Sequence, residues 1–521
     1  MTGSRDNGLS SRFLRGLARS ADRPAIKLGR EIITYRRAHE LALRWAASLL
    51  DAIPAENSGR PPVVGVLAEK NLTSYVGILA AVYAGGTVVP LNPAFPAART
   101  MHMLHLSGAR VVLADERGRA VIEALAGDGA VTGVAPPVVL VPDPSGRIGD
   151  AVPALEHPRP TAAADPAYML FTSGSTGTPK GVPITQGNLA SYFDTLDQRY
   201  DFGPDDVFTQ TFDLNFDCAM FDLFCAWGAG AVVAPLPPTA YLDLPMHLAE
   251  LGVTVWFSTP STISLVRRMG QLQPAVMPGL RWSFFAGEAL RCQDAADWHA
   301  AAPNCLLENI YGPTELTVTI TGHRWDPISS PARSVNGLVP IGAVHPGHDH
   351  VLVDDDDRPV ENEGELLITG PQMAPGYLDP ADNEGRFVHR DGRTWYRTGD
   401  RVRRLDRGEL VYLGRLDAQV QVQGWRVELA EIDHALRAQP GVEDAATVAL
   451  PTPDGIELVV FYTGRPSTPR QLSRALREIL PHGMLPNRYE HLADLPLNSN
   501  RKVDRAALAQ QARRTVQPVR K

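Results

Sequence analysis

Tyr168-Met-Leu-Phe-Thr-Ser-Gly-Ser-Thr-Gly-Thr-Pro-Lys-Gly181 is the most informative stretch of this sequence, because a short apolar run ends in hydroxyls, glycines and one lysine. Glycines allow backbone N–H groups to approach an anion closely, and Lys180 adds a positive charge. The spacing differs from the P-loop pattern, since Lys180 follows proline and precedes glycine. We predict a phosphate-binding loop of another kind, with a flexible Gly/Ser turn as the alternative.

Other short segments, spread over nearly the whole chain, resemble the adenylate-forming superfamily together with this loop. That family contains acyl-CoA synthetases, luciferases and the adenylation domains of nonribosomal peptide synthetases. In order, the further segments are Ile33-Thr-Tyr35, Tyr83-Ala-Gly-Gly-Thr-Val-Val-Pro90, Asn309-Ile-Tyr-Gly-Pro-Thr-Glu315, Gly364-Glu-Leu366, Tyr396-Arg-Thr-Gly-Asp400, Gly414-Arg-Leu-Asp417 and Asn500-Arg-Lys-Val-Asp-Arg505. One such segment alone would carry little weight, whereas the ordered set supports the resemblance over nearly the whole chain.

Size and composition describe an ordinary globular protein of more than one domain. The 521 residues exceed what one hydrophobic core usually supports. Apolar residues at 44%, charged residues at 21% and a formal charge of −8 give no sign of a nucleic-acid partner. The cysteines show neither zinc-ligand spacing nor a disulfide framework, and no apolar run is long enough for a membrane span. We therefore expect a cytoplasmic location.

The fold class expected is α/β. Strand-like and helical patterns alternate up to about residue 415, as at Val253-Thr-Val-Trp-Phe257 followed by residues 261–269, which predicts a large layered domain with parallel sheets. After that point, strand and helix patterns over about a hundred residues predict a compact α+β module. We place the large domain at 1–416 and the small domain at 417–521, with a hinge at Asp417.

The resemblance implies an ATP site in which Tyr311 stacks on adenine, Asn309 bonds the adenine edge and Glu315 holds Mg²⁺. Asp400 suits the ribose, because one carboxylate accepts hydrogen bonds from two adjacent hydroxyls. Lys180 and Lys502 are the expected catalytic residues, although Arg501 stands where the family commonly has glycine. The resemblance assigns the following residues to ATP: Thr172, Ser173, Gly174, Ser175, Thr176, Gly177, Gly287, Glu288, Ala289, Asn309, Ile310, Tyr311, Gly312, Pro313, Thr314, Asp400, Tyr412, Arg415 and Lys502.

Asp217 is the expected anchor for a substrate ammonium group, with Asp213 as the competing register. Counting back from Gly230-Ala231 selects Asp217, and a buried carboxylate facing an ammonium avoids two unpaired buried charges. The pocket positions implied by the resemblance are Phe216, Asp217, Cys218, Phe221, Phe257, Phe284, Ala286, Ile310, Val318, Thr319 and Lys502. Because several phenylalanines would fill this pocket, we expect a small neutral amino acid such as alanine, glycine or serine. Alternatively, some of these phenylalanine rings belong to the hydrophobic core and do not line the pocket.

The expected activity is therefore that of a free-standing amino acid adenylation enzyme, similar to D-alanine–carrier protein ligases. It would form an aminoacyl-AMP with ATP and Mg²⁺ and load the phosphopantetheine thiol of a separate carrier protein, with Gly424 lining the thiol's tunnel. Rotation of the small domain about Asp417 would separate the two half-reactions. The alternatives are an acyl- or aryl-CoA synthetase, which does not need Asp217, and a non-catalytic ATP-binding protein.

Overall fold

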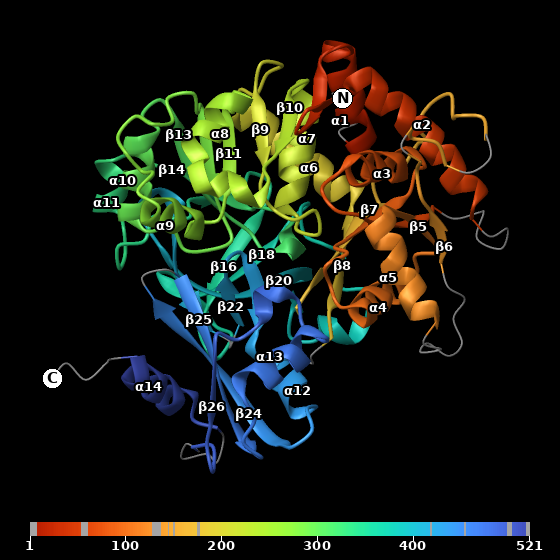
Figure 1. Ribbon diagram of the computed structural model, residues 1–521. Coiled ribbons are helices and arrows are strands. Elements are labelled where there is room, and N and C mark those ends of the chain that lie inside the picture. Colours follow the sequence, from red (N-terminus) through yellow and green to blue (C-terminus); the bar gives the residue numbers. More distant parts are fainter. Residues whose placement is uncertain are drawn as a thin grey trace.

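The computed structural model describes residues 8–53, 61–127, 137–143, 145–148, 152–173, 178–416, 419–452, 455–496 and 503–516. A large domain of packed sheets and helices lies above a smaller domain, which begins after the last strand of the large one (Figure 1). Within those ranges, no helix is both long and apolar enough to cross a bilayer.

The sheet that carries the glycine-rich loop runs in the order β6-β5-β3-β4-β7-β8. Its strands are β3 (Val63–Leu67), β4 (Thr87–Leu91), β5 (Val111–Ala114), β6 (Val138–Leu140), β7 (Pro166–Thr172) and β8 (Lys180–Thr185). Pairing is parallel except between β7 and β8, which form a hairpin whose rung Thr172–Lys180 flanks the loop. The crossover helices are α3 (Leu72–Tyr83), α4 (Ala97–Ser107) and α5 (Glu116–Gly127).

The second sheet runs in the order β15-β14-β13-β12-β11-β9-β10-β1-β2 and is parallel from β1 to β13. Its strands are β1 (Pro24–Leu28), β2 (Glu31–Thr34), β9 (Val207–Gln210), β10 (Val232–Pro235), β11 (Val255–Ser258), β12 (Trp282–Phe285), β13 (Leu306–Tyr311), β14 (Thr321–Arg324) and β15 (Ala343–Val344). Because parallel strands end at one edge, the segments after β11, β12 and β13 meet there. Those segments are the ones expected to bind nucleotide.

Helices cover both parallel sheets, and α7 is buried on nearly every side. Its sequence is apolar almost all round, as expected for a helix packed between layers, and Gly230 ends it in the left-handed conformation. The helices around these sheets are α1 (Leu9–Ser20), α2 (Tyr35–Asp51), α6 (Gln186–Arg199), α7 (Cys218–Ala229), α8 (Leu244–Leu251), α9 (Ser261–Arg268), α10 (Cys292–Ala301) and α11 (Ser329–Ala332).

A third sheet, fully antiparallel, was not expected from the sequence. It runs in the order β17-β16-β18-β20-β19, with β21 paired to β20. Its strands are β16 (Asp349–Val353), β17 (Pro359–Val360), β18 (Glu363–Thr369), β19 (Phe387–Arg390), β20 (Arg393–Arg404) and β21 (Leu410–Arg415). Strands β20 and β21 bring Asp400 and Arg415 opposite each other.

The small domain matches the expected α+β pattern. The hairpin of β22 (Gln419–Val422) and β23 (Trp425–Glu428) precedes a sheet of β24 (Val442–Thr452), β25 (Gly455–Gly464) and β26 (Arg488–His491). Alternate residues of β24 and β25 face opposite sides. Helices α12 (Leu429–Arg437) and α13 (Pro469–Arg477) contribute to the core on one side, and α14 (Arg505–Val516) packs on the other.

Candidate active site

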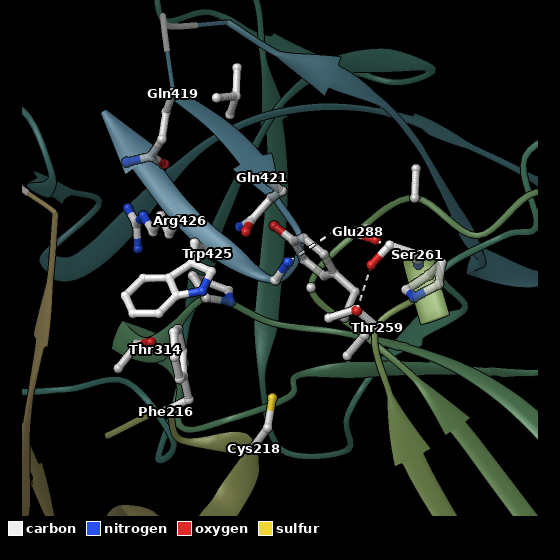
Figure 2. Close-up of a pocket in the computed structure, with 18 of the residues that line it drawn as sticks. Phe216, Cys218, Thr259, Ser261, Glu288, Thr314, Gln419, Gln421, Trp425 and Arg426 are labelled. Atoms are coloured by element: carbon white, nitrogen blue, oxygen red, sulfur yellow. Dashed lines mark hydrogen bonds between the residues drawn. The ribbon is translucent and has the colours of Figure 1, made fainter. Parts of the chain in front are cut away.

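A cavity of about 780 Å³ lies between the large domain and the hairpin of β22 and β23 (Figure 2). We call this hairpin the docked hairpin. Strand ends of the second sheet, β20, β21 and the start of α7 supply its walls. The expected site residues that line it are Thr172, Ser173, Phe216, Asp217, Cys218, Ala286, Gly287, Glu288, Ala289, Asn309, Ile310, Tyr311, Gly312, Pro313, Thr314, Val318, Asp400, Tyr412 and Arg415. Residues far apart in the chain are thus collected at one place.

Tyr311, Asp400 and Arg415 form a connected group on one wall. The Tyr311 hydroxyl donates to Asp400 Oδ2 at 2.6 Å, and Arg415 Nη1 donates to Asp400 Oδ1 at 3.0 Å. Burial raises the pKa of Asp400, and the Arg415 charge opposes that rise. Each carboxylate oxygen of Asp400 keeps a further lone pair, so Asp400 can still accept hydrogen bonds from the hydroxyl groups of a ligand.

Asn309 is held in one orientation by the backbone. Its Nδ2 donates to the carbonyl oxygens of Val339 and Pro340, at 3.2 and 2.9 Å. Both amide hydrogens are therefore used, which leaves the Oδ1 acceptor for a ligand. An acceptor at this position fits the exocyclic amine of adenine.

The turn after Tyr311-Gly-Pro-Thr-Glu315 is strained. Thr317 and Val318 have φ of 60° and 64°, in the left-handed region that β-branched residues avoid. The Gln372 side chain holds this turn, since its Nε2 donates to the carbonyl oxygens of Leu316 and Thr319 at 3.1 and 2.9 Å. The strain, of order 1–3 kcal/mol per residue, accompanies the placement of Val318 in the cavity wall.

Asp217 is a buried acid facing the cavity. Burial raises its pKa to about 6, against hydrogen bonds from Thr314 and from the Cys218 backbone. No ion pair of Asp217 is found among the residues that the structure describes. Asp213 differs, because it accepts from Asn92 Nδ2 at 3.1 Å and lines a second cavity. The geometry therefore favours the Asp217 register.

Phe221, Phe257 and Phe284 do not line the cavity, contrary to expectation. All are at most 1% exposed, and their ring centroids lie 5.0 to 6.3 Å apart in an edge-to-face cluster behind the wall. Thr319 is also buried, and its hydroxyl lies 3.3 Å from that of Tyr192. Edge-to-face packing is favourable for aromatic rings, which explains why these residues belong to the core.

Glu315, the expected metal ligand, is fully buried and already has strong partners. Tyr377 Oη donates to its Oε1 at 2.6 Å, and Arg426 Nη1 of the docked hairpin lies 3.1 and 2.9 Å from its two oxygens. Burial would raise the pKa of Glu315, but the Arg426 charge and the Tyr377 hydrogen bond outweigh it and lower the pKa. Lys180 pairs with Asp382 at 3.1 Å instead of facing the cavity.

The docked hairpin makes further contacts with the large domain. Gly424 N donates to Glu288 at 3.0 Å, and Ser173 Oγ donates to the Arg426 carbonyl at 2.7 Å. The Trp425 ring lies against Phe216, with centroids 5.0 Å apart (Figure 2). The hairpin thus closes the cavity from the small-domain side.

Several expected residues lie outside the described ranges: Gly174, Ser175, Thr176 and Gly177 of the glycine-rich loop, the hinge Asp417 and Lys502. Val503, next to Lys502, packs on the α14 side of the small-domain sheet. The roles of these residues remain predictions.

Sequence reasoning missed Tyr377, Trp425, Arg426 and the ion pair between Arg99 of α4 and Glu431 of α12, whose Nη1 and Oε1 lie 2.5 Å apart. Tyr377 follows a Pro-Gly turn, which carries no chemical signal of its own. Trp425 and Arg426 directly follow Gly424. The available signal was therefore a half-exposed strand pattern followed by a glycine, an aromatic residue and a cation.

Comparison with known proteins identifies the family. A model of the AMP-binding enzyme family matches residues 13–378. L-proline–[L-prolyl-carrier protein] ligase of Pseudomonas fluorescens is 32% identical over 514 residues, covering 96% of this chain and 99% of that protein. The chain spans only 8% of another relative, tyrocidine synthase 3 of Brevibacillus parabrevis, at 30% identity.

Two solved structures agree with this result. The crystal structure of IdnL7 is 54% identical with a TM-score of 0.73, covering 98% of this chain and 100% of that one. The Vibrio cholerae adenylation domain AlmE, in complex with glycyl-adenosine-5′-phosphate, is 26% identical with a TM-score of 0.85, covering 99% and 98%. The chain therefore belongs to the AMP-binding enzyme family, and it is an enzyme of the amino acid-activating ligase type.

Proposed function

We propose that this enzyme activates a small neutral amino acid with ATP and passes it to the phosphopantetheine thiol of a separate carrier protein. The observation that carries the proposal is Asp217, a cavity-facing carboxylate that is 8% exposed and has no ion-pair partner in the described residues. An ammonium group supplies the missing charge, because a lone buried carboxylate is costly. A fatty or aryl acid offers no such group.

The nucleotide would lie along the wall formed by Tyr311, Asp400 and Arg415. Asn309 Oδ1 accepts from the adenine amine, the Tyr311 ring covers the base, and Asp400 takes the ribose hydroxyls. The substrate carboxylate then attacks the α-phosphorus and pyrophosphate leaves. Lys502 is the proposed cation at this step, since preorganised charge is most valuable where negative charge develops.

Glu315 fits a magnesium site, with Thr314 beside it. Its carboxylate is fully buried, and against the effect of burial the Arg426 charge beside it helps to hold its pKa below the usual range. Carboxylate oxygens are the ligands that Mg²⁺ prefers, together with phosphates of the nucleotide. The metal would neutralise phosphate charge during adenylation.

The substrate side chain would lie against small and aliphatic residues. Cys218, Ala286, Ile310 and Val318 line it, and the buried phenylalanine cluster fills the volume behind. These four residues are uncharged, which suits alanine, glycine or serine. The glycyl-adenosine-5′-phosphate in the AlmE structure supports a small substrate.

The second half-reaction would use the docked hairpin. The carrier's thiol attacks the adenylate carbonyl and AMP leaves, with Gly424 at the tunnel and Asp417 as the hinge between the two poses. Named carrier-protein ligases among the relatives support a carrier as the acceptor. ATP and holo-carrier proteins are available in the cytoplasm, where we expect the reaction.

Amino-acid-dependent pyrophosphate–ATP exchange tests the proposal. The panel should contain both enantiomers of alanine, glycine, serine, proline and a set of fatty and aryl acids. Exchange with a small amino acid, followed by its transfer to a holo-carrier protein and not to coenzyme A, is the expected result. Exchange with fatty or aryl acids alone would establish a CoA synthetase instead.

A further inference from the structure

Gln372 lies between β18 and β19, is completely buried and does not line the cavity. Its side-chain Nε2 donates to the carbonyl oxygens of Leu316 and Thr319, at 3.1 and 2.9 Å. Its backbone carbonyl accepts from the Thr317 hydroxyl at 2.6 Å. Gln372 therefore contacts residues 316–319, which we call the wall turn, through both its side chain and its backbone.

The backbone of the wall turn is strained. Thr317 and Val318 have φ of 60° and 64°, and the Thr319 N–H donates to the Thr317 carbonyl at 2.8 Å. A positive φ at the centre of such a three-residue turn is rare, and it is most unfavourable for a β-branched residue. Strain of this kind persists only where surrounding contacts over-determine the backbone. The contacts from Gln372 meet that requirement.

Gln372 is itself held in one orientation. Asn188 of α6 donates from Nδ2 to the carbonyl oxygens of Pro371 and Met373, at 2.7 and 3.0 Å, and so fixes the backbone on both sides of Gln372. Because Nε2 of Gln372 faces carbonyl oxygens, its Oε1 is the atom that lies 3.1 Å from His345 Nδ1. That ring nitrogen therefore carries the hydrogen, and burial keeps His345 neutral by lowering its pKa to about 4.

The wall turn contributes one residue to the proposed substrate pocket. Val318 lines the cavity, together with Ala286 and Ile310. A β-branched side chain is stiff at χ1, so the position of its methyl groups follows the backbone. A change of Val318 to negative φ would therefore move these methyl groups relative to the rest of the wall.

We propose that Gln372 is a positioning residue for substrate selection: its amide holds the wall turn, and the wall turn places Val318 against the side chain of the amino acid. This inference rests on the proposed function, because it concerns the same pocket. Since Gln372 does not line the cavity, its replacement should change which amino acid is accepted more than it changes ATP binding. A purely structural glutamine would lower the amount of active enzyme and leave the ratio between substrates unchanged.

Gln372→Met tests the proposal, because methionine has a similar length and volume but no hydrogen-bond donor. Pyrophosphate exchange with alanine and with leucine, each at saturating ATP, gives the ratio of their kcat/KM values. This ratio should fall by about tenfold or more in Gln372→Met, since one methylene group in a hydrophobic pocket is worth about 10- to 200-fold. The KM for ATP should change by less than about twofold, because the nucleotide wall is untouched.

Gln186→Met is the matched control. Gln186 is also buried, its Oε1 accepts from the Leu9 N–H at 3.3 Å, and it does not line the cavity. The same substitution there removes a buried hydrogen bond and should leave the alanine-to-leucine ratio within about twofold of the wild-type value. If Gln372→Met does not fold, Gln372→Asn keeps the amide on a shorter side chain and should lower the ratio by a smaller factor.

Crystal structures of the two methionine variants give a second measurement, which does not depend on activity. Val318 should leave the positive-φ region in Gln372→Met and stay there in Gln186→Met. An unchanged substrate ratio in Gln372→Met, or a wall turn that keeps its φ values, overturns the inference. Failure of the proposed function is a separate result: the wild-type enzyme then shows no amino-acid-dependent exchange, while the position of Val318 in the two variants still tests the role of Gln372.

Discussion

Replacing Asp217 with alanine should raise the KM for the amino acid far more than the KM for ATP. The carboxylate lies at the start of α7, is 8% exposed, and has no ion pair in the described structure. Removing one partner of a buried charge pair typically costs about 2–5 kcal/mol, or about 30-fold to several thousandfold in affinity. Amino-acid-dependent pyrophosphate exchange, with alanine and glycine varied at saturating ATP, measures this change.

The pH dependence gives a second measure of the same carboxylate. An ammonium binds the ionised acid, and the pKa of Asp217 is raised to about 6 by burial. Below that pH the protonated form predominates, so kcat/KM for the amino acid should fall by about tenfold per pH unit. Asp217→Asn keeps the shape but cannot ionise, and it should lack this limb of the profile.

Asp213→Ala is the matched control, because the same residue type is removed from the same stretch. Asp213 accepts a hydrogen bond from Asn92 and lines a different cavity, so the KM for the amino acid should change by less than about threefold. A larger effect from Asp213→Ala than from Asp217→Ala would refute the register and the substrate pocket built on it.

Three further predictions concern the small domain. Lys502→Ala should slow single-turnover adenylate formation about a hundredfold, about 3 kcal/mol, with little change in ATP affinity; an unchanged rate removes Lys502 from the mechanism. Gly424→Ala should lower carrier loading at least tenfold, because φ is +83° and the new Cβ would lie 2.8 Å from Thr259 Cγ2; equal loss of pyrophosphate exchange contradicts this. Asp417→Pro fixes φ near −65° and should retain pyrophosphate exchange while losing carrier loading, whereas normal loading places the hinge elsewhere.

Most of the parallel framework could be predicted, because each helix and strand has a recognisable pattern in its own stretch of sequence. The expected strand at 253–257 is β11, the helix at 261–269 is α9, and the expected α+β module contains α12, on whose buried face Leu429, Ile432 and Leu436 lie. The antiparallel sheet of β16 to β21 was missed. Its short strands pair over irregular turns, and pairing across distant segments is set by packing that no single segment encodes.

The grouping of Tyr311, Asp400 and Arg415 on one cavity wall could be predicted for a similar reason. Tyr311, Asp400 and Arg415 each belong to a short motif, and parallel topology together with the β20–β21 rung brings them to one place. The phenylalanine pocket was not predictable in the same way. Whether Phe221 points into a cavity or into the core depends on rings contributed by β11 and β12, and those rings pack with each other.

The largest gap lies where the two domains meet, and it has a physical origin. Gly424, Trp425 and Arg426 form one turn in the sequence, but their contacts are with residues more than a hundred positions away, such as Glu315 and Glu288. A motif records which chemistry a site needs in one pose. It does not record which distant segment supplies the cation that a buried carboxylate needs. Glu315 is the clearest example, because its own motif carries no sign that Arg426, 111 positions away, lies beside its buried carboxylate.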